Sequence, residues 1–449
     1  MNNLLRLMIC LAIGSLAGSV FGQANYSTPY SFVTLAGMAG NNGAADGTNS
    51  SALFYWPEGT AVDTNGNVYV VDNYENTVRE LTPSGTNWVV TTIAGVANSS
   101  GGRADGLGGT ARFYEPTSIA TDGAGNLYVT DSGNNTIRKL APVGASWMVT
   151  TIAGTAGVSG PADGTNGTAQ FSNPSGIAVD AAGNLYVADA GNQTIRKLTP
   201  SGTNWVVTTI AGSPYNYGSL DGTNQVAQFF GPSGIAVDGS GNLYVADNIN
   251  STIRKITPVG TNWVVSTIAG AAQNNGSADG INQAAQFNYL YGIAADQAGN
   301  LFVADTYNNT IRKITRSGTN WVTSTLAGVP GGTGGSADGT GANAMFSNPY
   351  GIAVDGAGRV FVGDTLNGTI RMGQLISAVP NLNIRVTAPA SVTISWPAAG
   401  SFTLQTNKDL TPGNWVSYGN PPASNNGTNN VIISPAAGNL FFRLSNQSR

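Results

Sequence analysis

The chain has 449 residues, of which only 9% are charged, 41% are apolar and 61 are glycine, and its net charge is −4. The apolar content excludes a disordered chain, and low charge with abundant glycine is typical of a turn-rich all-β protein. The slightly acidic balance excludes the basic surface that a nucleic-acid partner would require, and the length allows two domains.

Residues 1–22 have the pattern of a secretory signal peptide. A single cation, Arg6, precedes the apolar run Leu7–Ile13, and small residues follow as far as Phe21. The alternative is a membrane anchor, but the run is shorter than the roughly 18 residues that a spanning helix needs. We therefore expect a secreted, periplasmic or cell-surface protein with no membrane span after cleavage. Because the only cysteine, Cys10, lies in this segment, the mature chain would have no disulfide or thiol chemistry.

One sequence unit, Gly176–Gly212, recurs six times along the chain at intervals of 58 or 59 residues. Three sets of aspartates mark this period, and a fixed period of this length indicates a repeat architecture. The first set is Asp63, Asp122, Asp180, Asp238, Asp296 and Asp355. The second set is Asp72, Asp131, Asp189, Asp247, Asp305 and Asp364. The third set is Asp46, Asp105, Asp163, Asp221, Asp279 and Asp338, each followed by glycine.

Each unit contains four apolar runs that favour β-strands. In the third unit they are Gly176–Val179, Asn184–Ala188, Thr194–Leu198 and Trp205–Ile210, and Gly, Asn and Pro separate them. Six units of four antiparallel strands predict a six-bladed β-propeller. A β-solenoid is the alternative, although its coils are usually much shorter.

The ends of the array predict how the ring closes. Five units end in a Trp strand such as Trp205–Gly212, but no copy follows Arg371. The missing copy is Tyr30–Gly37, at the other end of the array. The N-terminal strand should therefore complete the last blade and leave no open sheet edge.

These units resemble NHL repeats of the secreted bacterial type. They share Pro-x-Gly-Ile-Ala-Val-Asp, then Gly-Asn-Leu-Tyr-Val-Ala-Asp, then Asn-x-Thr-Ile-Arg-Lys, over roughly Tyr30–Leu375. The resemblance implies a propeller spanning residues 26–375, of a kind used for binding and sometimes for catalysis at the channel mouth.

The period ends at residues 376–384, which we interpret as a linker. Residues 385–449 should form a small β-sandwich-like C-terminal module. The expected strands are Val392–Trp396, Phe402–Gln405, Trp415–Tyr418, Val431–Ile433 and Leu440–Leu444. The module resembles short C-terminal modules of secreted bacterial proteins, which implies attachment or recognition.

The sequence contains no histidine, which excludes Ser-His-Asp and Cys-His catalysis and zinc sites that use histidine. Aspartates that recur in every unit should have a structural role in the blade. We expect Asp180 to form hydrogen bonds within its own turn and Asp189 to pair with Arg196. Three residues at the predicted channel rim, Glu58, Glu115 and Asn173, could imitate the rim of calcium-dependent gluconolactonase-like propellers.

Six aromatic residues depart from the repeat around the start of the first strand and in the loop after the second. They are Trp56, Tyr74, Tyr289, Tyr291, Tyr307 and Tyr350. They belong to units five, six and one, which are consecutive in a closed ring. We expect them on one arc of one face, where aromatic rings suit sugar or peptide recognition, or else fill gaps between loops.

These patterns favour a secreted, non-catalytic propeller that recognises a carbohydrate, a peptide or a cell-surface protein without a cofactor. The alternative is a calcium-dependent hydrolase that uses Glu58, Glu115 and Asn173. A purely structural surface-layer component is the third interpretation.

Overall fold

The computed structural model describes residues 29–376 of the chain, and seven stretches beyond them. These stretches are 383–388, 391–397, 402–407, 416–419, 422–425, 428–433 and 441–446. Internal contacts divide the chain after Leu375 into two compact units. The expected signal peptide with Cys10 lies outside the described residues. Within the described residues, no helix is long and apolar enough to cross a membrane.

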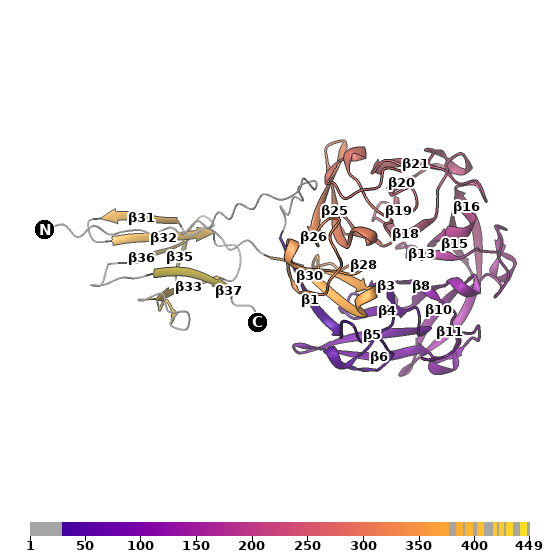
Figure 1. Ribbon diagram of the computed structural model, residues 1–449, viewed down its shortest axis with the longest axis horizontal. Coiled ribbons are helices and arrows are strands. Elements are labelled where there is room, and N and C mark those ends of the chain that lie inside the picture. Colours follow the sequence, from indigo (N-terminus) through magenta and orange to yellow (C-terminus); the bar gives the residue numbers. More distant parts are fainter. Residues whose placement is uncertain are drawn as a thin grey trace. The chain divides into compact units, whose positions relative to one another are not determined.

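The first unit is a ring of six antiparallel sheets with five strands each (Figure 1). This arrangement is the predicted all-β propeller. The sheets are called blades 1 to 6 in the order of their innermost strands, several of which gather near the middle of the ring (Figure 1). The innermost strands are β3 (Pro57–Val62), β8 (Pro116–Thr121), β13 (Pro174–Val179), β18 (Pro232–Val237), β23 (Ile293–Ala295) and β28 (Pro349–Val354).

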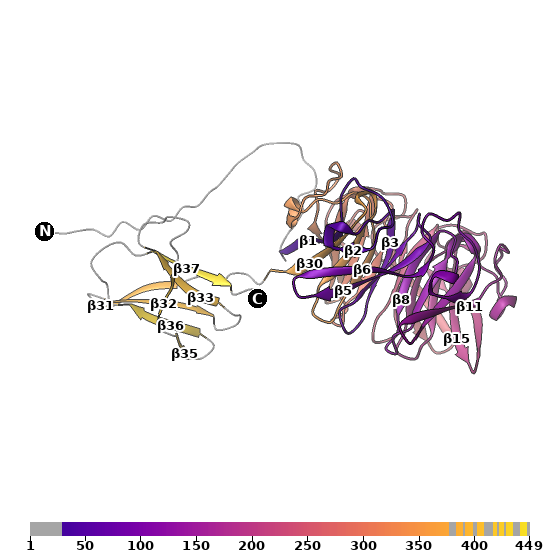
Figure 2. The same cartoon turned by 90° about the horizontal axis from the view of Figure 1, so that it is seen from below.

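Three further long strands follow outward in each blade, and β5 and β6 run side by side in Figure 2. The second strands are β4 (Val68–Asp72), β9 (Leu127–Asp131), β14 (Leu185–Asp189), β19 (Leu243–Asp247), β24 (Leu301–Asp305) and β29 (Val360–Asp364). The third strands are β5 (Thr77–Ser84), β10 (Thr136–Val143), β15 (Thr194–Ser201), β20 (Thr252–Val259), β25 (Thr310–Ser317) and β30 (Thr369–Leu375). The fourth strands are β6 (Asn87–Gly95), β11 (Ser146–Ala153), β16 (Asn204–Ala211), β21 (Asn262–Ala269), β26 (Asn320–Ala327) and β1 (Tyr30–Gly37).

Each blade has a fifth, two-residue strand that the sequence analysis did not predict. These strands are β2 (Gly47–Thr48), β7 (Gly106–Leu107), β12 (Gly164–Thr165), β17 (Gly222–Thr223), β22 (Gly280–Ile281) and β27 (Gly339–Thr340). A 3₁₀ turn follows each of them: η1 (Asn49–Ser51), η2 (Gly108–Thr110), η4 (Asn166–Thr168), η6 (Asn224–Val226), η7 (Asn282–Ala284) and η9 (Gly341–Asn343). Four more 3₁₀ turns join second and third strands: η3 (Ser132–Asn134), η5 (Ala190–Asn192), η8 (Thr306–Asn308) and η10 (Thr365–Asn367). The strand prediction was therefore one strand short in every blade.

A buried arginine holds this fifth strand to the blade. In blade 3, Arg196 donates to Asp189 Oδ2 at 2.7 Å and to Asp163 Oδ1 at 2.9 Å. Its guanidinium lies 5.1 Å from the ring centre of Phe171. The predicted pairing of Asp189 with Arg196 is confirmed. Asp163, of the third set of aspartates, binds the same arginine, and this contact fixes the loop that carries the extra strand.

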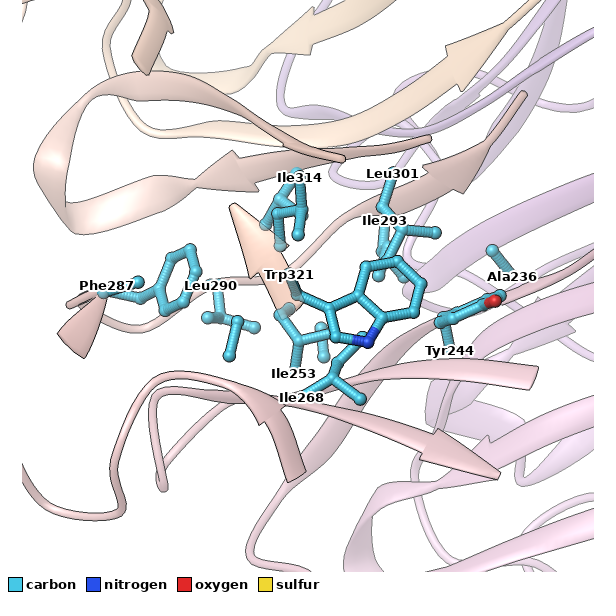
Figure 3. Close-up of a cluster of buried hydrophobic side chains, with 14 residues drawn as sticks. Ala236, Tyr244, Ile253, Ile268, Phe287, Leu290, Ile293, Leu301, Ile314 and Trp321 are labelled. Carbon is cyan, nitrogen blue, oxygen red and sulfur yellow. The ribbon is translucent and has the colours of Figure 1, made fainter. Parts of the chain in front are cut away.

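The hydrophobic core lies between neighbouring blades. Figure 3 shows Tyr244, Ile253 and Ile268 of blade 4 packed against Ile293 of blade 5, with the indole of Trp321 between them. All of these side chains are at least nine-tenths buried. Side chains alternate between the two faces of a strand, so each sheet buries one face against each neighbour.

The ring closes as predicted, because β1 pairs antiparallel with β30, in the register Phe32↔Gly373. In Figure 1 the indigo β1 lies beside the orange β30. The strand also pairs with β27, so it is the fourth strand of blade 6.

In the second unit, the described strands form two antiparallel sheets. They are β31 (Asn383–Ala388), β32 (Ser391–Pro397), β33 (Phe402–Asn407), β34 (Val416–Ser417), β35 (Ala423–Asn425), β36 (Thr428–Ile433) and β37 (Phe441–Asn446). Ile394, Trp396, Leu404 and Val431 form a buried cluster that both sheets share. Neither β31 nor β35 was predicted, and β31 begins at Asn383, inside the segment expected to be a linker.

Candidate ligand-binding face

The channel at the centre of the propeller is narrow. A Cβ atom on Gly234 of β18 would lie 2.2 Å from the Tyr291 carbonyl oxygen, and one on Gly292 would lie 2.2 Å from that of Tyr350. Glycine therefore lets the innermost strands approach closely, and the space between them measures about 100 Å³. A ligand larger than a few water molecules therefore does not fit inside the channel.

Three positions of every blade meet at one mouth, because the start of the innermost strand pairs with the end of the second, as Pro174 does with Asp189. The inner position follows the proline at the start of the innermost strand, or Leu290 in blade 5, and is occupied by Glu58, Thr117, Ser175, Ser233, Tyr291 and Tyr350. The outer position, just before the proline, is occupied by Trp56, Glu115, Asn173, Gly231, Tyr289 and Asn348. The loop after the second strand contributes Tyr74, Gly133, Gly191, Ile249, Tyr307 and Leu366.

The outer position has a left-handed backbone in every blade. Asn173 and Asn348 adopt φ of 48° and 49°, a conformation that asparagine and glycine tolerate well. Trp56, Glu115 and Tyr289 adopt it too, with φ of 62°, 48° and 48°. For such side chains this conformation costs about 1–3 kcal/mol, and strain of this kind clusters at functional sites.

The preceding blade holds this strained position in place. The Glu115 backbone N–H donates to Asn76 Oδ1 at 2.8 Å, and the Asn173 N–H donates to Asn135 Oδ1 at 2.7 Å. Asn76 and Asn135 themselves have positive φ at the turn into the third strand. The side chains of the outer position thus project from a backbone fixed on both sides.

A depression of about 770 Å³ opens at this mouth, mainly over blades 1 and 2, and we call it the mouth depression. It brings together six residues singled out from the sequence: Trp56, Glu58, Tyr74, Glu115, Asn173 and Tyr350. Its other lining residues are Asn73, Glu75, Asn76, Asn98, Ser99, Ser100, Tyr114, Thr117 and Ser132.

The three remaining predicted aromatic residues do not line the mouth depression. Tyr291 lies at the channel, where its ring stacks on Tyr350 with centroids 3.8 Å apart. Tyr289 stacks on Tyr307 at 4.9 Å within blade 5. The predicted arc therefore consists of separate pairs, and only its blade 6 and blade 1 members reach the depression.

One wall of the mouth depression is an aromatic cluster of blade 1. Tyr55 stacks on Tyr74 at 3.9 Å, and Trp56 stands nearly perpendicular to both, with interplanar angles of 79° and 76°. Trp56 and Tyr74 remain 39% and 53% exposed. Tyr55, Tyr114 and Asn73 were missed from the sequence, although Tyr55 and Tyr114 differ from the serines at the equivalent places in blades 3 and 6.

Glu58 lines the depression, and the residue is only 9% exposed. Asn73 Nδ2 donates to its Oε2 at 3.3 Å. Burial, followed by the charges of Glu115 and Asp72, raises the pKa of Glu58 to about 8. Burial, followed by the charge of Glu58, also raises the pKa of Tyr350 well above its ordinary value. Without a cation nearby, the ionised forms of Glu58 and Tyr350 are therefore disfavoured at this site.

Glu75 is a further departure that the sequence analysis left without a role. At its position in blade 3, Asn192 Nδ2 donates to Asp189 Oδ2 at 2.8 Å. Glu75 has no hydrogen to donate when ionised, and instead accepts from the Asn98 N–H at 2.8 Å. Burial mainly, with a contribution from the charge of Glu75, raises the pKa of Asp72 to about 8. Arg79 Nη1 donates a hydrogen bond to Asp72 Oδ2 at 3.2 Å. Blade 1 therefore departs from the repeat in its scaffold as well.

The donor set at the depression fits a metal ion only in part. Glu58, Glu115 and Asn173 supply two carboxylates and one amide from three successive blades. Within the described residues, no group of three or more His, Cys, Asp or Glu side chains could hold a metal ion. Calcium takes about six to eight oxygen ligands, so most would have to come from backbone carbonyls, the ligand or water.

Comparison with known proteins identifies the repeats. The NHL repeat family model matches residues 54–81, 113–140, 171–198 and 229–256, which belong to blades 1 to 4. SUPPRESSOR OF QUENCHING 1 of Arabidopsis thaliana is 29% identical over 62% of this chain and 26% of its own length. NHL repeat-containing protein 2 of Homo sapiens is 28% identical over 61% of this chain and 40% of its own length. The chain thus matches less than half of each relative.

Solved structures share the fold at lower identity. A structural genomics protein of unknown function from Bacteroides thetaiotaomicron has a TM-score of 0.59 and 22% identity, covering 77% of this chain and 76% of its own. An auxiliary nutrient binding protein from the same species has a TM-score of 0.57 and 17% identity, covering 78% and 77%. The chain thus contains four matched NHL repeats, and these solved structures share its β-propeller fold.

Proposed function

We propose that this protein is a non-catalytic binding propeller that recognises a carbohydrate or a peptide at the mouth depression. The observation that carries the proposal is the depression of about 770 Å³ with exposed aromatic rings at its wall and a buried carboxyl group in its lining. Ligand sites are typically concavities of about 300–1,000 Å³ with aromatic walls and a few polar groups.

Two features of the chain support binding over catalysis. The sequence has no histidine, and the second set of aspartates is bound to buried arginines in every blade. Strained aromatic and acidic residues occur where other blades have Asn or Gly, so the departures from the repeat gather on one face. The fold itself is compatible with binding, since an auxiliary nutrient binding protein shares it.

Glycan and peptide arrays probed with the labelled protein test this proposal. The informative variant is Trp56→Asn, because blades 3 and 6 carry asparagine at this position with nearly the same backbone. Tyr217→Ala is the control: Tyr217 is exposed, stacks on Phe230 and does not line the depression. We expect array ligands to be lost with Trp56→Asn and retained with Tyr217→Ala. Equal loss or equal retention in both variants would contradict the site.

We further propose that the protein is exported and acts outside the cytoplasm, on the pattern of residues 1–22. Expression in a bacterial host with cell fractionation, and N-terminal sequencing of the exported form, should show cleavage near Gly22 or Ala24. Retention of an uncleaved chain in the cytoplasm would overturn export without affecting the binding face.

A calcium-dependent hydrolase is the second candidate, because Glu58, Glu115 and Asn173 line one depression. Calcium held by these residues would polarise a substrate carbonyl. Calorimetric titration with calcium, repeated on Glu58→Gln, tests this candidate. Stoichiometric binding that the variant loses would favour it and justify a lactone screen, whereas a wild-type protein that binds no calcium would eliminate it.

A further inference from the structure

The lining of the mouth depression is acidic and contains no cationic side chain. Three of the four glutamates in the chain, Glu58, Glu75 and Glu115, line it, and none of its lining residues is lysine or arginine. Glu75 already accepts a hydrogen bond from the Asn98 N–H. Among the described residues, no hydrogen bond or ion pair involves the exposed Glu115 side chain. A ligand that enters the depression therefore meets two carboxyl groups, Glu58 and Glu115.

The buried carboxyl group of Glu58 is poorly neutralised by the protein itself. Within the described part of the chain, its side chain receives one hydrogen bond, the 3.3 Å contact from Asn73 Nδ2. A carboxyl group that is nine-tenths buried ordinarily has several donors or a cation beside it. Burial, followed by the charges of Glu115 and Asp72, disfavours its ionised form, and a cation in the depression would stabilise that form.

The rings of the wall are arranged for a compact cation rather than for a flat ring. One face of Tyr74 is covered by Tyr55, and the plane of Trp56 is turned 76° from that of Tyr74. The exposed rings are therefore not coplanar and do not form one stacking platform. Aromatic faces that meet at steep angles beside carboxylates are suited to ammonium and guanidinium groups.

The burial of Glu58 favours a long side chain over an amino sugar. Trp56 is 39% exposed, whereas Glu58 is only 9% exposed and directly precedes Gly59, which lines the narrow channel. Lysine and arginine have apolar stems that pack on aromatic rings while their charged ends extend to a carboxylate. The amine of an amino sugar is attached directly to its ring and lacks this reach.

From these observations we propose that the mouth depression binds the lysine or arginine side chain of a peptide, with the charged end between Glu58 and Glu115 and the stem against Trp56. This inference rests on the proposed function, because it names the ligand group that the same depression would take.

Calorimetry on the full chain tests the inference with blocked tripeptides as probes. The probes are acetylated and amidated Gly-Lys-Gly, Gly-Arg-Gly, and Gly-Lys-Gly with its lysine amine acetylated. We expect the lysine or arginine probe to bind, and the loss of charge on acetylation to weaken binding at least tenfold. Binding of the acetylated probe with equal affinity, or binding of none of these probes at millimolar concentration, would overturn the inference.

Matched variants distinguish binding at the mouth depression from attraction by the overall negative charge of the protein. Glu58→Gln keeps the shape of the side chain and should weaken binding of the charged probe at least tenfold. Glu80→Gln is the control, since Glu80 is the fourth glutamate and lies on β5 outside the depression. If Glu58→Gln does not fold, Glu115→Asn replaces it as the test, because blades 3 and 6 carry asparagine there. Unchanged affinity in the folded variant would overturn the inference.

The outcome also distinguishes this inference from the proposed function. A neutral saccharide or neutral peptide whose binding is lost in Trp56→Asn but kept in Glu58→Gln would overturn the inference and support the proposed function. A glucosamine trimer that binds when the lysine and arginine probes do not would do the same. Absence of any array ligand that depends on Trp56 would contradict both.

Discussion

At the residue scale, each blade depends on a buried arginine with several acceptors. Arg196 donates to Asp189, to Asp163 and to the backbone carbonyls of Gln170 and Ala162. Asp189 is buried, whereas the Asp163 side chain is 48% exposed. The two ion pairs should therefore differ in their contribution to stability, because solvent screens the second and not the first.

We predict that Arg196→Met destabilises the protein by about 3–5 kcal/mol, because it leaves the Asp189 carboxylate buried without its partner. Asp163→Asn should lower the free energy of unfolding by only about 0–1 kcal/mol, because the ion pair between Asp163 and Arg196 is partly exposed to solvent. Urea unfolding followed by circular dichroism measures both free energies of unfolding. If both substitutions lower the free energy of unfolding by a similar amount, burial does not determine how much each ion pair of Arg196 contributes to stability.

Asp238, of the first set, should make stability depend on pH. Burial alone would raise its pKa, but hydrogen bonds from the Asn242 side chain and backbone, the Ser240 N–H and the Tyr244 hydroxyl lower the pKa of Asp238 below its ordinary value. A carboxylate with a lowered folded-state pKa stabilises the protein above its unfolded-state pKa of about 3.9. That contribution is lost as pH falls through the folded-state value.

The expected result is that Asp238→Asn reduces the free energy of unfolding by about 1–3 kcal/mol at pH 7, because hydrogen bonds to the charged acceptor are lost. The difference from the wild type should shrink below about pH 4 as the wild-type carboxylate becomes protonated. Thermal unfolding of both proteins between pH 2.5 and pH 7 checks this. A difference that stays constant over that range would contradict the assignment.

Pairings across a hairpin could be predicted from spacing, whereas contacts made by long loops could not. Asp189 and Arg196 are seven residues apart on adjacent strands, so the repeat alone brings them together. Asp163 reaches the same arginine only because the loop before β13 folds back along β16, and no spacing in the sequence encodes that path. The short fifth strand was missed for the same reason.

The candidate site could be predicted in part, from residues that depart from the repeat. Six of the residues singled out from the sequence line the mouth depression, and five of them depart from the repeat, since equivalent positions of a propeller share one face. The direction of each side chain could not be predicted, because it depends on the left-handed backbone of residues such as Trp56 and Glu115. Tyr289 has the same left-handed backbone but stacks on Tyr307 outside the depression, whereas Tyr114, which was missed, lines it.

At the scale of elements, the innermost strands are placed by glycine. A Cβ on Gly234 would contact the Tyr291 carbonyl oxygen of the next blade at 2.2 Å, although its own φ is not left-handed. The close approach of β18 and β23 therefore depends on the missing side chain. Gly239, in the turn after β18, has open space around its Cβ position.

We expect Gly234→Ala to lower the free energy of unfolding by about 1–3 kcal/mol, because the two strands must move apart. Gly239→Ala is the matched control and should be neutral or slightly stabilising, since it only restricts the unfolded chain. Chemical denaturation of the two variants in parallel gives both values. A neutral Gly234→Ala would mean that the innermost strands can separate without loss of packing.

At the scale of the whole molecule, one N-terminal strand holds both ends of the ring. The Phe32 side chain of β1 is fully buried and meets the Phe346 ring at 5.2 Å in an edge-to-face contact. Val33, the next residue, is 40% exposed and pairs with Met372 on β30. Packing around Phe32 therefore joins β1, the first strand among the described residues, to the other three long strands of blade 6, which come from the opposite end of the propeller sequence.

Phe32→Ala should destabilise the whole propeller by about 3–5 kcal/mol, the usual cost of removing a buried phenylalanine, whereas Val33→Ala should cost little. Hydrogen exchange shows whether this loss is local or global. If closure by β1 stabilises the ring as one unit, amides of β15 in blade 3 lose protection together with those of β30. If only β30 loses protection, each blade is stable by itself and the N-terminal strand merely covers the edge of blade 6.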